Sequence, residues 1–337
     1  MKLIDFSIGE PNLPLHPLIV KAQNELFCKA RYLPYPPVQG LKELRELVCE
    51  ESPYKPHECL ISPGAKFSLF ACLHSLFKKE EEGIIFTPFW GCYPHMLKEC
   101  GLKVQVTSSL KTLKINTNTR FIIINNPNNP SGEVLKQDEL KCLLEIAIKH
   151  NLFLIFDEVY SNYVYGNTPF ISGVSLYPKY DKIILIQSLS KNYSLAAWRI
   201  GFALAKEEFI QKMYSFQKFS ATGAPTPSQK LAIEVLKNKN IIKKNHFEIM
   251  QERREEFAKN FYSIFGINLS LPQGGFYFWL PKHYFLYSKK MEEATHTKLL
   301  DGTFMGNPNY FRITLSADSK ISLEGLQRIK DYVNVHS

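Results

Sequence analysis

Four short apolar runs constrain the fold of this chain most strongly, because their apolar residues are continuous rather than alternating. The runs span residues 83–87, 120–125, 153–157 and 182–187 and are rich in Ile, Leu and Phe. A continuous run of this length is typical of a strand buried on both faces, as in a parallel sheet covered by helices. Residues 137–150, between the second and third runs, carry apolar side chains at helical spacing, which predicts a βαβ unit. The sequence therefore indicates an α/β fold with a mainly parallel sheet flanked by helices.

The last third of the chain has a different pattern. Residues 226–265 are strongly helix-forming, and a helical stretch of this length often bridges two domains. After it, residues 275–280 and 310–315 resemble strands and residues 323–333 a closing helix. We therefore expect a smaller α+β domain in addition to the α/β domain.

Composition narrows the class of protein. The chain has 337 residues, 45% of them hydrophobic and 22% charged, which is enough for one large core or two packed ones. Its longest apolar runs are far shorter than the about 20 residues of a membrane span. Asp5 lies where a signal peptide would be apolar, so we expect a cytoplasmic protein without a membrane span. The seven cysteines include no C-x-x-C pair, which argues against a disulfide framework and a zinc site, and we expect no metal.

The formal net charge of +9 and the Lys-rich stretch 237–244 could suit nucleic acid. No RNP-type aromatic motif, basic arm or paired-histidine finger accompanies the charge, so we favour a solvated helix face and expect no nucleic-acid partner. The sequence has no G-x-G spacing, no P-loop, no G-x-S-x-G and no H-E-x-x-H. These absences argue against an NAD site in a Rossmann domain, an ATPase and the commonest serine-hydrolase and zinc-protease sites.

Polar motifs follow three of the predicted strands, where ligands bind in open α/β sheets. Asn126-Pro-Asn-Asn-Pro-Ser-Gly132 follows the second run, Asp157-Glu-Val-Tyr160 follows the third, and Ser188-Leu-Ser-Lys191 follows the fourth, with Arg199 eight residues further on. Each motif alone has a structural explanation as a turn, a helix cap or a surface lysine. Their common position at the strand ends predicts a single site.

With these motifs the chain resembles the fold type I, class I and II pyridoxal-phosphate-dependent aminotransferases of the aspartate aminotransferase superfamily. The resemblance covers nearly the whole chain and also rests on Ile8-Gly9-Glu10-Pro11, the segment 35–45, Gly64-Ala65-Lys66, Phe89-Trp90 and Phe311-Arg312-Ile313. It implies amino transfer between an L-amino acid and a 2-oxo acid, with pyridoxal 5'-phosphate as cofactor. We expect a large cofactor-binding domain at residues 32–245 and a small domain, formed by residues 1–31 and 246–337, that closes over the substrate.

Three residues are expected to be catalytic. Lys191 supplies the amine that the cofactor aldehyde needs as a Schiff base, and its freed amine could carry the proton from the substrate Cα. By the resemblance, Asp157 pairs with the ring nitrogen and keeps it protonated. Tyr160 would hydrogen-bond the phenolic oxygen of the ring, with Asn129 as a second donor, although a core tyrosine is an equal explanation for Tyr160 alone.

The resemblance assigns further residues to the two ligands. Those expected to bind the cofactor, besides the catalytic residues, are Gly64, Ala65, Lys66, Trp90, Asn129, Ser188, Ser190 and Arg199. Among them, Arg199 and the amides of the helix start would hold the phosphate, and Trp90 would stack on the ring. The residues expected to contact the substrate are Gly9, Asn129 and Arg312, with Arg312 gripping the α-carboxylate. Tyr35 would reach the cofactor phosphate of the neighbouring subunit, which implies a homodimer.

Other functions stay open from the sequence. The same site could direct the chemistry to elimination by a C–S lyase or to decarboxylation, because the choice depends on which Cα bond stands perpendicular to the ring. A catalytically silent ligand-binding relative is a further alternative, against which the joint presence of Lys191, Asp157 and Arg199 argues. No second arginine can be assigned to a substrate side-chain carboxylate, so the sequence predicts no dicarboxylic preference.

Overall fold

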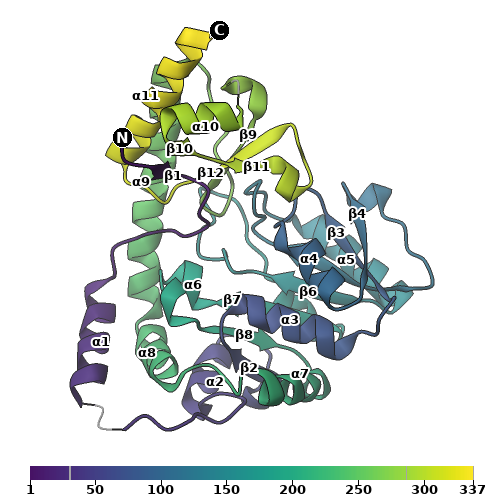
Figure 1. Ribbon diagram of the computed structural model, residues 1–337. Coiled ribbons are helices and arrows are strands. Elements are labelled where there is room, and N and C mark those ends of the chain that lie inside the picture. The colour runs from purple at the N-terminus through teal and green to yellow at the C-terminus, as the bar shows by residue number, and fades with distance from the viewer. Residues whose placement is uncertain (30–31, 286, 337) are drawn as a thin grey trace.

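A seven-stranded sheet forms the centre of the larger part of the molecule (Figure 1). Its strands follow the order β2-β8-β7-β6-β5-β3-β4. The structure is a computed structural model that describes residues 1–29, 32–285 and 287–336. Only β8 runs antiparallel to its neighbours. The strands are β2 (Cys59–Ser62), β3 (Glu82–Phe86), β4 (Lys103–Thr107), β5 (Thr119–Asn125), β6 (Phe153–Asp157), β7 (Ile183–Ser188) and β8 (Gly201–Leu204).

The four predicted strands are β3, β5, β6 and β7, and each lies within one residue of its expected bounds. They are consecutive in the sheet and parallel. Their carboxyl ends therefore meet at one edge, with Asn125 of β5 opposite Asp157 of β6. The predicted fold class is confirmed.

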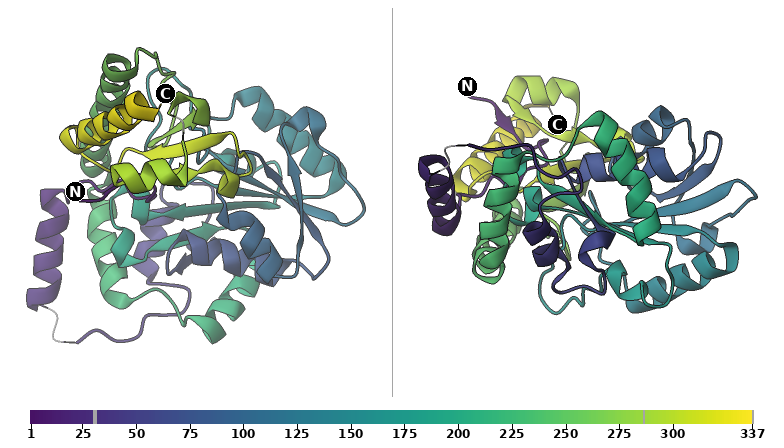
Figure 2. Two further views of the ribbon diagram at one scale, coloured as in Figure 1. Left: turned by 45° about the horizontal axis from the view of Figure 1, so that its top comes forward. Right: turned by 90° about the horizontal axis from the view of Figure 1, so that it is seen from below.

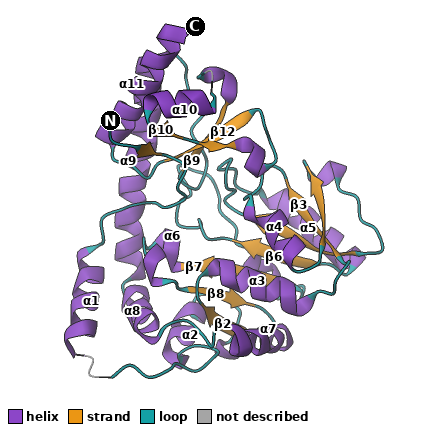
Figure 3. Cartoon of the chain, in the orientation of Figure 1, coloured by secondary structure: helices purple, strands orange, loops and turns teal. Residues whose placement is uncertain are grey.

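Helices cover both faces of this sheet, as the turned views (Figure 2) and the view coloured by secondary structure (Figure 3) show. One face carries α2 (Lys42–Cys49), α5 (Gln137–His150) and α8 (Thr226–Lys237), with α1 (Pro17–Lys29) against α8. The other face carries α3 (Ala65–Leu76), α4 (Cys92–Glu99) and α7 (Glu207–Ser220). In β5, Ile122 packs toward the first group and Ile123 toward the second. Burial on both faces explains why the strand lacks polar alternation.

A smaller unit lies over the carboxyl edge of the sheet and contains both ends of the chain (Figure 1). Its antiparallel sheet has the order β11-β12-β9, and a short parallel pair joins β1 to β10. The elements are β1 (Ile4–Asp5), β9 (Tyr277–Pro281), β10 (Thr297–Lys298), β11 (Leu300–Asp301), β12 (Tyr310–Thr314), α10 (Lys289–Thr295) and α11 (Ser319–His336). The N-terminal segment thus pairs with the small unit, whereas α1 packs on the large one. The expected domain boundaries stay a prediction.

The predicted helical stretch 226–265 is two helices rather than one. The chain breaks at Asn238 between α8 and α9 (Lys239–Phe265). Helix α9 connects the two units, because Ile242 lies in the core of the large unit and Phe257 in that of the small unit. No helix within the described ranges is long and apolar enough to cross a membrane.

Two lysines of the Lys-rich stretch form ion pairs on the surface. Lys237 Nζ lies 3.0 Å from Glu43 Oε1, and Lys239 Nζ lies 3.0 Å from Glu50 Oε2 and 2.9 Å from Glu51 Oε1. Neighbouring acids thus already neutralise these charges, as the interpretation of a solvated helix face requires.

Candidate active site

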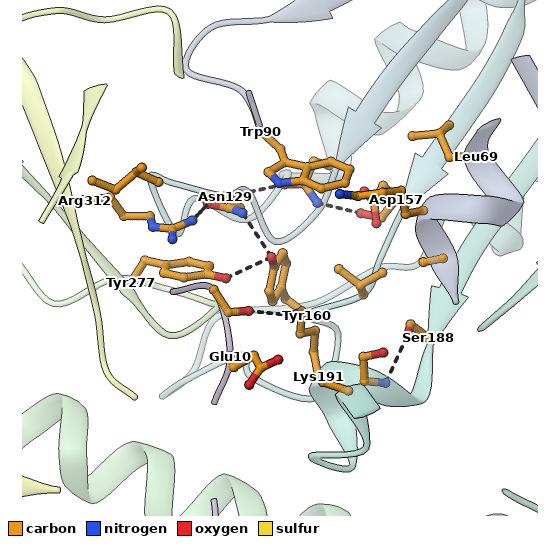
Figure 4. A pocket seen from close by; sticks show the side chains of 18 of the residues that line it. Glu10, Leu69, Trp90, Asn129, Asp157, Tyr160, Ser188, Lys191, Tyr277 and Arg312 are labelled. Carbon is orange, nitrogen blue, oxygen red and sulfur yellow. Dashed lines mark hydrogen bonds between the residues drawn. The ribbon is translucent and has the colours of Figure 1, made fainter. Parts of the chain in front are cut away.

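A cavity of about 420 Å³ lies where β5, β6 and β7 end, beneath the small unit (Figure 4). Most residues that the sequence assigned to the site line this cavity. They are Gly9, Ala65, Lys66, Trp90, Asn129, Asp157, Tyr160, Ser188, Ser190, Lys191, Arg199 and Arg312. Gly64 lies directly behind Arg199 instead. Tyr35 is 89% exposed between α1 and α2, so its contact with a neighbouring subunit stays a prediction.

Asp157 is the last residue of β6, and the sheet carries it into the floor of the cavity. The hydroxyl of Tyr93 donates to its Oδ2 at 2.7 Å, while the buried Oδ1 has no hydrogen-bond partner among the described residues. Burial raises the pKa of Asp157 to about 6, and the bond from Tyr93 opposes that rise. The carboxylate thus has one oxygen held by the protein and one available to a cationic partner.

A chain of hydrogen bonds links the two units across the cavity (Figure 4). Asn129 Nδ2 donates to the Tyr160 hydroxyl at 3.0 Å, and this hydroxyl lies 3.0 Å from that of Tyr277 on β9. Arg312 Nη1 on β12 donates to Asn129 Oδ1 at 2.9 Å, and its Nη2 donates to the backbone oxygen of Ser7 at 2.6 Å. The guanidinium also lies over the Tyr277 ring, 4.2 Å from its centroid. These contacts fix Arg312 while its buried Nε has no partner in the described chain.

Lys191 belongs to α6 (Leu189–Asn192), the short helix that follows β7. Its Nζ donates a hydrogen bond to the backbone oxygen of Gly9, so the amine lies beside the N-terminal segment. Burial lowers the pKa of Lys191 to about 8, against the raising effect of the Glu10 carboxylate. The positive charges of Arg312 and Arg199 lower it further. A substantial fraction of the amine is therefore neutral slightly above neutral pH.

The other end of the cavity suits an anion. Helix α3 begins at Ala65, and the backbone N–H groups of Ala65 and Lys66 make no hydrogen bond within the described residues. Arg199 adds a cation beside this helix start. Gly64 has φ +90°, and a Cβ there would lie 2.5 Å from Arg199 Nη2. Glycine suits this position because the backbone conformation disfavours any side chain and because a Cβ would displace the guanidinium.

These features fit pyridoxal phosphate, the cofactor that the resemblance implies. The unpaired Oδ1 of Asp157 suits a protonated ring nitrogen, and the free amides at the start of α3 with Arg199 suit a phosphate dianion. Lys191 supplies an amine for the aldehyde. The Trp90 ring lines the same cavity, where it can lie against the cofactor ring.

Sequence reasoning missed three residues of the site. Tyr93 lies in the first turn of α4, whereas Trp90 precedes that helix, so no helical spacing links the two residues and no pattern in the sequence singles out Tyr93. Glu10 lies in a motif that was noted without a role for its carboxylate. Tyr277 gave no signal, because its contact with Tyr160 joins positions that are 117 residues apart.

Comparison with known proteins identifies the family. The family model described as aminotransferase class I and II matches residues 1–329. The probable aspartate/prephenate aminotransferase of Aquifex aeolicus is 29% identical, and the match covers 97% of this chain and 90% of that protein. The aspartate aminotransferase of Bacillus subtilis is 27% identical, over 99% of this chain and 92% of that protein.

Solved structures agree with this assignment. The aromatic aminotransferase from Pyrococcus horikoshii has a TM-score of 0.90 at 26% identity, over 99% of this chain and 96% of that chain. The aspartate aminotransferase from Thermus thermophilus with maleate has a TM-score of 0.90 at 22% identity, over 98% and 91%, and shows the same fold. The relatives named here are all aminotransferases, which favours amino transfer over the lyase, decarboxylase and silent alternatives. The chain therefore belongs to the class I and II aminotransferase family and is a pyridoxal-phosphate-dependent aminotransferase.

Proposed function

We propose that this aminotransferase takes the amino group of a dicarboxylic L-amino acid and passes it to a 2-oxo acid, and that the residues of the cavity bind the cofactor and the substrate. The observation that carries the proposal is the set of groups around one cavity: an amine, a carboxylate with a free oxygen, and cations at separate positions. Lys191 and Asp157 supply the first two, and Arg199, Arg312 and Lys66 supply the cations. This set matches the reacting amine, the ring nitrogen, the phosphate and the carboxylates of the ligands.

Asp157 provides the negative charge that the chemistry needs. When bound, pyridoxal phosphate supplies an electron sink that stabilises negative charge at the substrate Cα. Asp157 supports this function if its Oδ1 pairs with a protonated ring nitrogen, for which the unpaired oxygen is available. The hydroxyl of Tyr160, positioned by Asn129, offers a polar contact to the phenolic oxygen of the ring.

Lys191 acts as the general base. Its Nζ takes the proton from the substrate Cα, a role that requires a neutral amine. Burial and the positive charge of Arg312 favour that neutral form. Before the cofactor binds, the hydrogen bond to the backbone oxygen of Gly9 holds the amine at the edge of the cavity.

Arg312 binds the α-carboxylate of the substrate. Its side chain is buried in the cavity wall, and its contacts with Asn129, Ser7 and the Tyr277 ring hold the guanidinium in one orientation. A planar guanidinium held in this way suits a carboxylate in a bidentate arrangement. Gly9 keeps the space in front of it open, since a Cβ at Gly9 would lie 3.2 Å from the Tyr277 hydroxyl and 3.7 Å from Arg312 Nη2.

Lys66 binds a second, distal carboxylate. Its ammonium group lies 5.1 Å from the centroid of the Trp90 ring and has no ion-pair partner within the described residues. An unpaired cation in the wall of a substrate cavity favours an anionic side chain. The names of two relatives, with aspartate and prephenate as their substrates, support the same class of ligand.

Lys66→Met tests this proposal with L-aspartate and L-alanine as amino donors. We expect kcat/KM for aspartate to fall about 10- to 100-fold, the effect of losing a hydrogen bond to a charged group, and kcat/KM for alanine to stay within about threefold. Lys141→Met, which removes an exposed charge on α5, is the matched control and should change neither value. Equal losses for both donors, or a wild-type enzyme that does not accept aspartate, would show that the dicarboxylic assignment is wrong.

We also propose that the enzyme is a homodimer. Tyr35 and Phe219 are 89% and 85% exposed, and they lie on adjoining segments, because Gln217 Nε2 at the end of α7 donates to the backbone oxygen of Val38 at 2.6 Å. Large exposed aromatic side chains that lie near one another are typical of an interaction surface. A second copy of the chain at this surface would bring its own Tyr35 toward the neighbouring site.

A further inference from the structure

Tyr93 hydrogen-bonds the Asp157 carboxylate and has no role in the proposed function. It lies in the first turn of α4 and is 2% exposed. Its hydroxyl is the only side-chain donor to the Asp157 carboxylate in the described part of the chain, at 2.7 Å from Oδ2. The other carboxylate oxygen, Oδ1, is equally buried and unpaired.

This contact differs from that of Tyr54, a buried tyrosine outside the cavity. The hydroxyl of Tyr54 donates to the backbone oxygen of Ile183 at 3.0 Å, as a core tyrosine satisfies its polar atom. Tyr93 instead donates to an ionisable group that lines the cavity. Its ring also meets the Trp90 ring edge to face, with centroids 5.3 Å apart and an interplanar angle of 89°. One side chain thus supports two of the groups proposed to face the cofactor ring.

We propose that Tyr93 is a positioning residue of the cofactor site: its hydroxyl fixes Oδ2 of Asp157 and keeps the carboxylate ionised, so that Oδ1 stays available to the protonated ring nitrogen. The inference rests on the proposed role of Asp157. It extends that role to a residue that need not touch cofactor or substrate. A phenol suits the task because burial raises the pKa of Tyr93 well above its usual range, so the hydroxyl remains a donor at every working pH.

The groups around Asp157 determine how the loss of the Tyr93 hydroxyl would change the pKa of this carboxyl group. Burial raises the pKa of Asp157, and the bond from Tyr93 is the largest of the effects that lower it, ahead of the backbone N–H of Val159 and the charge of Lys191 on α6. The other titratable groups near the carboxylate are Glu158 and the hydroxyls of Tyr160 and Tyr277. Glu158 is an acid, and the hydroxyls of Tyr160 and Tyr277 bond to each other rather than to Asp157, so none of these groups supplies the missing hydrogen bond. Without the hydrogen bond from Tyr93, the pKa of Asp157 should therefore rise further.

Two cofactor forms and the variant Tyr93→Phe test the proposal without measuring turnover. The dissociation constants of pyridoxal phosphate and of its carbon analogue, with C–H in place of the ring nitrogen, are measured for the full chain between pH 5 and 8. Both forms share the aldehyde and the phosphate, so their affinity ratio isolates the partner of the ring nitrogen. Phenylalanine keeps the ring that packs on Trp90. Tyr54→Phe is the matched control, because it removes a buried hydroxyl outside the cavity.

We expect Tyr93→Phe to lower the preference for pyridoxal phosphate over the carbon analogue about 10- to 100-fold at pH 7. We also expect the pH at which this preference declines to shift upward, since a carboxylate with a raised pKa becomes protonated at higher pH. A folded Tyr93→Phe protein with the preference and pH profile of wild type would overturn the inference. An equal loss of affinity for both forms would also overturn it, because that result indicates a purely structural role.

Asp157→Asn separates this inference from the proposed function. If Asp157→Asn removes the preference for the ring nitrogen and Tyr93→Phe does not, only the role of Tyr93 is wrong. If Asp157→Asn leaves the preference intact, the proposed role of Asp157 fails, and the inference fails with it. Tyr54→Phe should match wild type in both measurements, and a change there of the size expected for Tyr93→Phe would also count against a specific role.

Discussion

Burial acts on Asp157 and Lys191 in opposite directions, because it disfavours the charged form of each. It raises the pKa of the carboxyl to about 6 and lowers that of the amine to about 8. Between these values the carboxylate is mostly charged, and part of the amine is neutral. A site that needs an anion beside the ring nitrogen and a base beside the substrate Cα gains both states near neutral pH.

The state of Lys191 leads to a prediction about cofactor uptake. Only the neutral amine attacks an aldehyde, so the rate at which the cofactor-free protein incorporates pyridoxal phosphate should rise with pH, with a midpoint at about 8. The Glu10 carboxylate favours the ammonium form, so Glu10→Gln should move the midpoint down by about half a pH unit, as for one exposed charge. Stopped-flow absorbance at a series of pH values measures both midpoints. The exposed control Glu145→Gln should match wild type, and a Glu10→Gln profile that coincides with it would contradict the prediction.

At the scale of elements, the start of α3 depends on a glycine that no other residue can replace without cost. Gly64 has φ +90°, and its missing side chain leaves the space that Arg199 occupies. Gly64→Ala should therefore destabilise the fold by about 1 kcal/mol through its backbone conformation. It should also lower the affinity for pyridoxal phosphate at least about tenfold, because the Cβ displaces the guanidinium from the anion end of the cavity. Thermal unfolding and cofactor titration measure the two effects.

Gly166→Ala is the control for that substitution. Gly166 also has a positive φ, +62°, but a Cβ there would meet no atom within 4 Å. It should lose a similar stability and keep the cofactor affinity of wild type. Equal cofactor affinities in the two variants would mean that the position of Arg199 does not depend on the space beside Gly64.

The sequence predicted those elements whose residues form a recognisable local pattern, and it missed elements without one. Strands β3, β5, β6 and β7 were predictable because burial on both faces leaves a continuous apolar run. The strand β4 was missed because it lies at the edge of the sheet, where Val104 and Val106 are exposed among polar neighbours. The break at Asn238 was also missed, since the residues on both sides of it are good helix formers.

The residues of the candidate site also fall into a group that local sequence motifs predicted and a group that they did not. Residues in local motifs at strand ends, such as Asp157 and Lys191, were identified together with the cavity that they line. The contact between Asn129 and Arg312 joins two units and 183 positions of sequence, so no local pattern reports it. The resemblance to a family supplied Arg312, but only the structure shows which residues hold it in place.

At the scale of the whole molecule, the cavity is assembled from three parts of the chain. The N-terminal segment supplies Gly9, the large unit supplies Lys191, and the small unit supplies Arg312. Arg253 on α9 ties the first part to the third, because its Nη1 donates to the backbone oxygens of Pro11 and Leu315 at 2.9 and 3.2 Å. Movement of the small unit would therefore carry the N-terminal segment with it, and both would close over a bound substrate.

A second copy of the chain would add a residue to the cavity if Tyr35 reaches the cofactor site of the neighbouring subunit. Mixed dimers of two variants test whether it does. In a dimer of one Tyr35→Ala and one Lys191→Ala subunit, the site of the first subunit keeps its own lysine and receives an intact Tyr35 from the second. Mixing the two variants should then restore about half of the wild-type activity per mixed dimer, at a cofactor concentration too low to fill the Tyr35→Ala homodimer.

The control pair combines Lys191→Ala with Asp157→Ala. Both residues line the same cavity of one chain, so every site in that mixed dimer lacks one of them, and no activity should return. If Tyr35 served its own subunit, the first pair would behave like this control, because neither site would have both Tyr35 and Lys191. Recovery confined to the Tyr35 pair would mean that the exposed position of this tyrosine reflects a role in the neighbouring subunit rather than in its own.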